Sequence, residues 1–195
     1  MAFLVALALY ATLPGDSAPI RHAVTLLAVL AGVPLVVLNP LRYSRQEPWS
    51  RDLSVGLHGV VAAATLAALG ETVAGLVIQG TPRLLVAALQ VWVAMVLSFS
   101  LLYWQIDRDG PVARLHPELP HRRRPDFRFR EQGGATPWSA WYVDYLRTSF
   151  RTAVAFMTAD ATPVSRRAKW LTAVESFAGY VLIGVVIARA VALVV

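Results

Sequence analysis

Four apolar runs, each about as long as a bilayer-crossing helix, constrain the fold of this chain most strongly. They cover residues 20–38, 53–78, 82–104 and 170–195 and are separated by segments rich in charge and proline. A helix needs about 20 apolar residues to cross the ~30 Å hydrocarbon core of a bilayer. We therefore predict an all-α integral membrane protein with four transmembrane helices, forming a single membrane domain over residues 1–195.

The composition supports a membrane environment. Hydrophobic residues make up 56% of the chain and charged residues 15%, whereas a soluble domain usually carries about 25% charged residues. The formal charge of +6 does not indicate a nucleic-acid partner, because the basic residues gather beside apolar runs, as they do at cytoplasmic membrane flanks. The absence of cysteine and the lack of ligand spacing among the four histidines predict neither a disulfide, nor a metal, nor a cofactor.

The first apolar stretch, residues 1–13, is too short to cross a bilayer alone, since a helix of that length is only about 20 Å long. We predict a short, uncleaved helix. The alternative is the core of a signal peptide. It is disfavoured because Lys and Arg are absent from the start of the chain, and Pro14-Gly15-Asp16 follows where a small-residue cleavage site would be needed.

The segment 105–141 is polar and punctuated by prolines, and we predict a cytoplasmic loop. Within it, Phe127 and Phe129 alternate with arginines, which would suit a short strand. An extended arm on the membrane surface is the preferred interpretation, because a lone strand has no partner for its edge. Aromatic and basic residues together can also bind single-stranded nucleic acid, but basic clusters beside a membrane ordinarily meet anionic lipid headgroups.

Residues 142–158 predict an amphipathic helix, with a charged side formed by Asp144, Arg147 and Arg151. This helix is too charged to cross lipid, since an arginine at the bilayer centre costs about 2.5–3.5 kcal/mol on insertion scales. We predict that it either re-enters the membrane or lies flat in the interface. Asp160 to Pro163 would end it.

Charge asymmetry predicts the orientation. Three successive crossings place the loops 39–52 and 105–141 on one side, and the basic cluster at 166–169 joins them if 142–158 does not cross. That side holds thirteen of the eighteen Lys and Arg residues, so the positive-inside rule makes it cytoplasmic. The side chains predicted to contact anionic lipid headgroups are Arg122, Arg123, Arg124, Arg147, Arg151, Arg166, Arg167 and Lys169.

Two intramembrane ion pairs follow from counting residues along the predicted spans. Glu71 and Arg189 fall at a similar depth near the outer face, and His58 and Glu175 both fall near the cytoplasmic end. Because lone charges are costly in hydrocarbon, we predict a contact in each pair. The alternatives are that each side chain reaches its nearest interface separately, or that Arg83 replaces Arg189 as the partner of Glu71.

The C-terminal half contains a series of residues with a recognisable order, namely Asp144-Tyr145-Leu146, Thr148-Ser149-Phe150, Thr152-Ala153, Phe156, Thr158, Asp160-Ala161-Thr162-Pro163, Arg166 and the helix after it. In these residues it resembles the pore module of two-span pore-loop potassium channels. With Tyr103 to Asp107 and Pro125 to Phe127, the chain also looks like a group of uncharacterised small bacterial membrane proteins. The resemblance implies a bacterial cytoplasmic (inner) membrane protein with a pore helix, a filter and an inner helix.

The resemblance does not extend to the filter. Aligning Asp160 and Pro163 with the family pattern places residues 155–159 at the filter, where both glycines are absent. Potassium selectivity is not expected, because the filter uses a ring of backbone carbonyls whose angles glycine permits. The family's pore loop also enters from outside, whereas the charge count puts this one at the cytoplasmic face. The charge count takes precedence because it rests on thirteen residues.

These patterns leave two functional interpretations. The preferred one is a non-catalytic scaffold, a lipid-binding protein or a subunit of a larger complex. In each case the chain is expected to contact the anionic headgroups of the bilayer. The alternative is a channel-like homo-oligomer with a pore lined by Thr148, Thr152, Thr158, Asp160 and Thr162. An intramembrane enzyme is not predicted, since no serine–histidine dyad, paired membrane aspartates or metal-ligand cluster is visible in the sequence.

Overall fold

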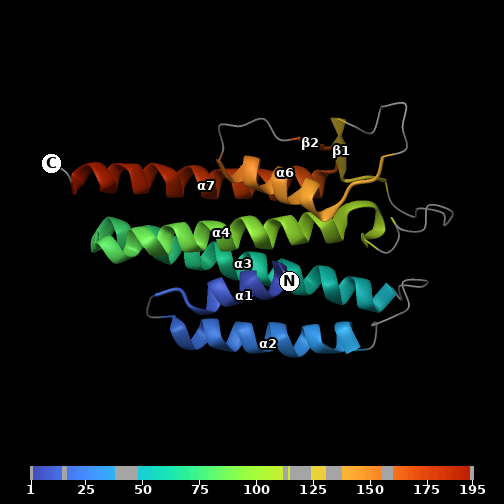
Figure 1. Ribbon diagram of the computed structural model, residues 1–195, viewed down its shortest axis with the longest axis horizontal. Helices are drawn as coiled ribbons and strands as arrows, with labels where there is room; N and C mark the ends of the chain where they lie inside the picture. The colour runs from blue at the N-terminus through green and yellow to red at the C-terminus, as the bar shows by residue number, and fades with distance from the viewer. Residues whose placement is uncertain are drawn as a thin grey trace.

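The protein is described by a computed structural model in which the helices lie side by side along the long dimension of the molecule (Figure 1). The structure describes residues 2–14, 17–37, 48–111, 114, 124–130, 138–154 and 160–193, with the backbone alone at 33–37, 48–50 and 109. The elements are α1 (Ala2–Ala11), α2 (Ala18–Val37), α3 (Pro48–Ile78), α4 (Pro82–Ile106), the 3-10 helix η1 (Asp107–Asp109), β1 (Phe127–Phe129), α6 (Tyr142–Val154), β2 (Ala161–Pro163) and α7 (Arg166–Ala192).

Three helices in the described part of the chain are long and apolar enough to cross a membrane. They are α3 over Arg51–Ile78, α4 over Pro82–Ile106 and α7 over Arg166–Ala192. The prediction is confirmed as far as an all-α fold with three helices able to span a membrane, and the fourth span stays a prediction. α2 is apolar over the shorter stretch Ala18–Gly32.

The long helices alternate in direction. α2 and α4 end, and α3 and α7 begin, at the same end of the bundle (Figure 1). The helix ends that border segments 39–52 and 105–141 therefore lie at one end of the molecule, as the succession of apolar runs predicts.

α4 is the centre of the bundle and contacts α1, α3, α6 and α7. It is apolar on all sides, which is the pattern of a helix surrounded by other helices. Val91, Met95, Phe99 and Tyr103 are each at most 1% exposed. They recur every four residues and so form one continuous buried stripe.

The short helix predicted for residues 1–13 is α1. It packs against α4, and a side chain of α4 binds its C-terminal end. The amide Nε2 of Gln90 donates to the carbonyl of Leu9 at 2.9 Å and to Oγ1 of Thr12 at 2.7 Å. The last carbonyls of a helix lack partners within it, so Gln90 satisfies one of them. Pro14, just beyond, cannot continue a helical ladder.

The extended-arm prediction for residues 126–130 is wrong, because β1 has a partner. β1 pairs antiparallel with β2, with Phe127 opposite Pro163 and Phe129 opposite Ala161. Phe127 and Phe129 point to the same side of the strand, are at most 2% exposed and pack on Tyr145. The alternation therefore reflects a buried face and a solvent-facing one.

Candidate functional site

α6 packs antiparallel along α4. At its first turn, the Tyr142 hydroxyl lies 2.9 Å from Oγ of Ser100, and its ring contacts Trp104. Near its last turn, the ring of Phe150 meets Trp92 edge-on at 5.5 Å. These contacts span about two turns of α6, and β2, which follows α6 in the chain, pairs with β1 (Figure 1). The predicted choice between a helix that re-enters the membrane and one that lies flat in the interface stays a prediction.

Small residues allow α6 to pack closely on α7. Ala153 on α6 is fully buried. A Cβ atom placed on Gly179 of α7 would lie 2.1 Å from the carbonyl oxygen of Ala153. No real Cβ approaches an oxygen so closely, so the contact between these helices requires glycine at position 179.

A buried carboxyl group joins α7 to α4 and α6, but its partner is not the predicted histidine. Glu175 is fully buried and accepts hydrogen bonds from the hydroxyl of Tyr103, at 2.5 Å, and from that of Ser149. His58 instead places Nδ1 2.7 Å from the carbonyl of Ser54 on its own helix. The His58–Glu175 prediction is wrong because each group finds a nearer partner.

The Glu71–Arg189 prediction is also wrong. Glu71 forms an ion pair with Arg21 at 3.5 Å and accepts a hydrogen bond from Ser17 at 2.6 Å. The guanidinium group of Arg189 lies instead over Gly80, in the turn between α3 and α4, where φ is +61°. A side chain on Gly80 would collide with that guanidinium group, and the left-handed backbone angle also favours glycine there.

Two buried aspartates, with the residues that contact them, hold the sheet end of the bundle together, and we name this cluster the Asp107–Asp126 junction. Asp107, fully buried just after α4, accepts hydrogen bonds from the backbone N–H groups of Asp126 at 2.7 Å and Phe127 at 3.2 Å. Its other oxygen accepts the hydroxyl of Tyr145 at 2.5 Å. One carboxylate thereby connects α4, β1 and α6.

The second carboxylate of the junction, that of Asp126, receives α7. Ser165 donates to it at 2.5 Å and Nε of Arg167 at 2.6 Å, and Nη2 of Arg167 donates to its second oxygen. Such two-point guanidinium–carboxylate contacts are the stronger and more directional kind. Ser165 also accepts the N–H of Ala168, so it caps α7. Arg167, predicted to contact lipid headgroups, is thus engaged inside the fold.

Arg114 and Tyr145 complete the junction. Neither residue belongs to the three long apolar helices. Arg114 donates to the carbonyls of Asp107 and Trp104 at 2.8 and 2.9 Å and lies 5.1 Å from the Tyr145 ring. Burial lowers the pKa of Arg114. Burial, offset in part by Arg114 and reinforced by Asp107, raises the pKa of Tyr145. The Tyr145 hydroxyl therefore keeps its proton and stays a donor.

The predicted pore-lining threonines that the structure describes differ in exposure and in hydrogen bonding. Thr148 is fully buried and donates to the carbonyl of Asp144, and Thr152 donates to that of Thr148, each at 2.8 Å. Thr162 is exposed in β2. Thr158 lies outside the described residues.

Asp160, the remaining predicted lining residue, is neutralised by α6. Its carboxylate contacts Arg151 at 2.5 Å and Arg147 at 3.2 Å. Arg147 and Arg151 are therefore not purely headgroup contacts, although the Arg147 side chain remains 56% exposed. Of the other basic residues in that prediction, Arg124, Arg166 and Lys169 are exposed, and Arg122 and Arg123 lie outside the described residues.

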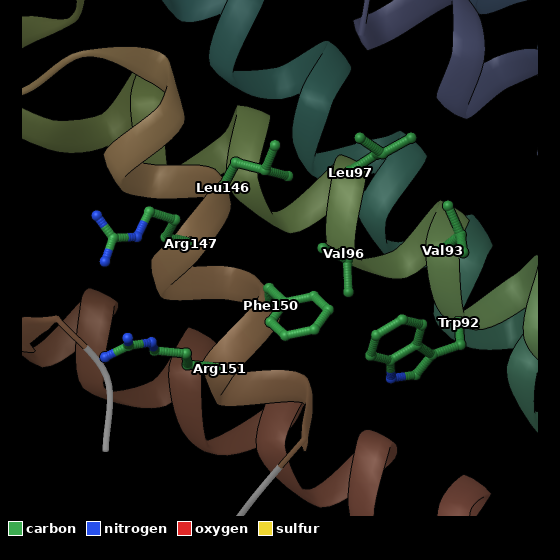
Figure 2. Close-up of a pocket in the computed structure, with 8 residues that line it drawn as sticks. All are labelled: Trp92, Val93, Val96, Leu97, Leu146, Arg147, Phe150 and Arg151. Atoms are coloured by element: carbon green, nitrogen blue, oxygen red, sulfur yellow. The ribbon is translucent and has the colours of Figure 1, made fainter. Parts of the chain in front are cut away.

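An open apolar groove of about 590 Å³ lies between α4 and α6. It is lined by Trp92, Val93, Val96, Leu97, Leu146, Arg147, Phe150 and Arg151. Figure 2 shows the rings of Trp92 and Phe150 next to one another. The guanidinium groups of Arg147 and Arg151 lie on the other side of Phe150. The sequence contains both halves of this groove as helix-spaced residues, but nothing in it shows that they meet.

No three His, Asp or Glu side chains come close enough to hold a metal ion in the part of the chain that the structure describes. Comparison of the chain with models of protein families, with curated proteins and with solved structures found no match. The resemblance to pore-loop channels therefore stays a prediction. The candidate site comprises α6, the groove between α4 and α6, and the Asp107–Asp126 junction.

Proposed function

We propose that this chain is a multi-span protein of the bacterial inner membrane that acts as a non-catalytic scaffold, as a lipid-binding protein or as a partner subunit. α2 serves as the fourth span, and the segments 39–52 and 105–141 face the cytoplasm, where the positive-inside rule places them. In this proposal, the re-entrant helix α6 is a fixed structural part.

The observation that carries the proposal is that polar side chains of α6 and of Asp160 have hydrogen-bond or ion-pair partners within the chain. The hydroxyls of Thr148 and Thr152 bond to carbonyls of their own helix, and Asp160 is held by two arginines. A path for ions needs polar groups that replace the hydration shell. Groups already committed to internal partners favour a packing role instead.

The second candidate is an oligomeric channel-like protein with a pore loop that is not selective for potassium. It is favoured by the packing of α6 against both α4 and α7, which suits the pore-helix plan that the resemblance implies. A single re-entrant helix cannot enclose a pore, so this candidate requires several copies around an axis.

Ion flux from liposomes separates the two candidates. We expect purified, reconstituted protein to give no more flux than empty liposomes, with vesicles treated with an ionophore as the positive control. Flux that rises with protein content, and that falls when Asp160→Asn or Thr158→Ala is introduced, would establish the channel-like candidate instead. The mass of the purified protein in detergent provides a second test, because a monomer cannot form the axial pore.

A further inference from the structure

The groove between α4 and α6 combines an apolar wall with an excess positive charge at its edge. Arg147 and Arg151 share the single carboxylate of Asp160, so these three groups carry one net positive charge. Asp144, the other acid of α6, accepts the N–H of Trp141 at the start of the helix. The exposed guanidinium of Arg147, which shares the carboxylate of Asp160, can therefore bind a further anion through charge-assisted hydrogen bonds.

The wall of the groove beside these arginines is apolar. It is formed by Trp92, Val93, Val96 and Phe150, and the polar Nε1 atom of Trp92 is buried and so does not face the groove. The groove therefore presents a hydrocarbon surface next to guanidinium groups.

We propose that the groove binds one anionic phospholipid, a ligand that deepens the lipid-binding role proposed above and rests on it. The phosphate meets the guanidinium groups of Arg147 and Arg151, and an acyl chain lies along Phe150 and Trp92. Guanidinium groups bind phosphate oxygens through charge-assisted hydrogen bonds.

The charge and the shape of the groove favour this occupant over a second copy of the chain. The wall is narrow and apolar, as suits an acyl chain, and the Arg147 side chain is 56% exposed, so a phosphate can reach it from outside the bundle. A phospholipid also supplies both required parts, an anion and a hydrocarbon chain, in one molecule.

Native mass spectrometry of the detergent-purified full chain tests this proposal. The protein is titrated with phosphatidylglycerol, with phosphatidylcholine of the same acyl chains, and with glycerol 3-phosphate as the headgroup without chains. We expect one phosphatidylglycerol to be retained roughly tenfold more readily than phosphatidylcholine, a ratio typical of charge-assisted contacts, and glycerol 3-phosphate not to be retained.

Two variants and one matched control locate the binding. Arg147→Gln should reduce the preference for phosphatidylglycerol roughly fivefold or more, since it removes the exposed guanidinium. Phe150→Ala should weaken retention of both lipids. The control Arg83→Gln removes another exposed charge, at the start of α4 and away from the groove, and should change neither. Thermal unfolding of each variant confirms that it remains folded.

The proposal is overturned if the two lipids are retained equally, or if Arg147→Gln and Arg83→Gln have the same effect. Retention of glycerol 3-phosphate would also overturn it, by assigning the arginines to a soluble phosphate. A dimer that forms in place of lipid retention would assign the groove to a second copy. The liposome flux result stands apart from these outcomes, so a non-conducting protein without lipid retention leaves the scaffold proposal standing and refutes this one.

Discussion

Gly179→Ala is expected to destabilise the protein by about 1–3 kcal/mol or more, as overpacking a tight contact usually does. The new methyl group would stand 2.1 Å from the carbonyl oxygen of Ala153, so α6 and α7 must move apart. Separation weakens the burial around Ser149 and Glu175, which meet across the same interface. Unfolding in detergent, followed by circular dichroism, measures the loss.

Gly184→Ala is the matched control on the same helix. A Cβ at Gly184 meets no atom within 4 Å, so the substitution brings only the helix propensity of alanine, worth up to about 1 kcal/mol in its favour. The two variants should therefore shift stability in opposite directions. Equal effects from both would show that α6 does not pack on α7 as described.

The helices could be predicted from the sequence because their signals are local. Apolar length indicates a membrane helix, and the run predicted at 82–104 corresponds to α4 over Pro82–Ile106. Proline fits the first turn of a helix, where its missing N–H costs nothing, and this marks where α4 begins. The amphipathic run predicted at 142–158 likewise corresponds to α6 over Tyr142–Val154.

The ion pairs could not be predicted, because depth along a helix is only one of the coordinates that a contact needs. Counting residues placed Glu71 and Arg189 at similar levels but did not show which helices are neighbours around the bundle. The structure brings the start of α2 to Glu71, so Arg21 becomes its partner. Glu175 similarly accepts hydrogen bonds from hydroxyls of α4 and α6. Its partners therefore depend on where α6 packs in the bundle.

The sheet shows a different limit. Phe127 and Phe129 carry the alternation of a strand, but the partner segment Ala161–Pro163 is short and includes a proline. In sequence it has the features of a helix terminator. Proline lacks the N–H of a central strand and is tolerated at sheet edges, and Pro163 is the last residue of β2. The pairing depends on α6 returning the chain, which no local pattern encodes.

Asp107→Ala is expected to have the largest effect of any single substitution considered, a loss of about 3–5 kcal/mol, because it removes the acceptor of several buried donors at once. Asp107 is fully buried and accepts three hydrogen bonds, two from backbone N–H groups of β1 and its preceding residue and one from Tyr145. Alanine leaves all three donors without an acceptor, and each unsatisfied buried donor costs about 1–3 kcal/mol. Denaturant unfolding in mixed micelles measures the change.

Asp52→Ala controls for loss of an acidic side chain, because Asp52 is exposed near the start of α3 and an exposed substitution usually changes stability by no more than about 0.5 kcal/mol. Asp107→Asn separates hydrogen bonding from charge, since its amide oxygen can still accept the two backbone N–H groups while its NH₂ meets the Tyr145 oxygen. We expect Asn to lie between Ala and the native residue. If Asp107→Ala lowered the free energy of unfolding no more than Asp52→Ala, the junction would not hold α4, β1 and α6 together. The description of α6 as a helix anchored by Asp107 would then be contradicted.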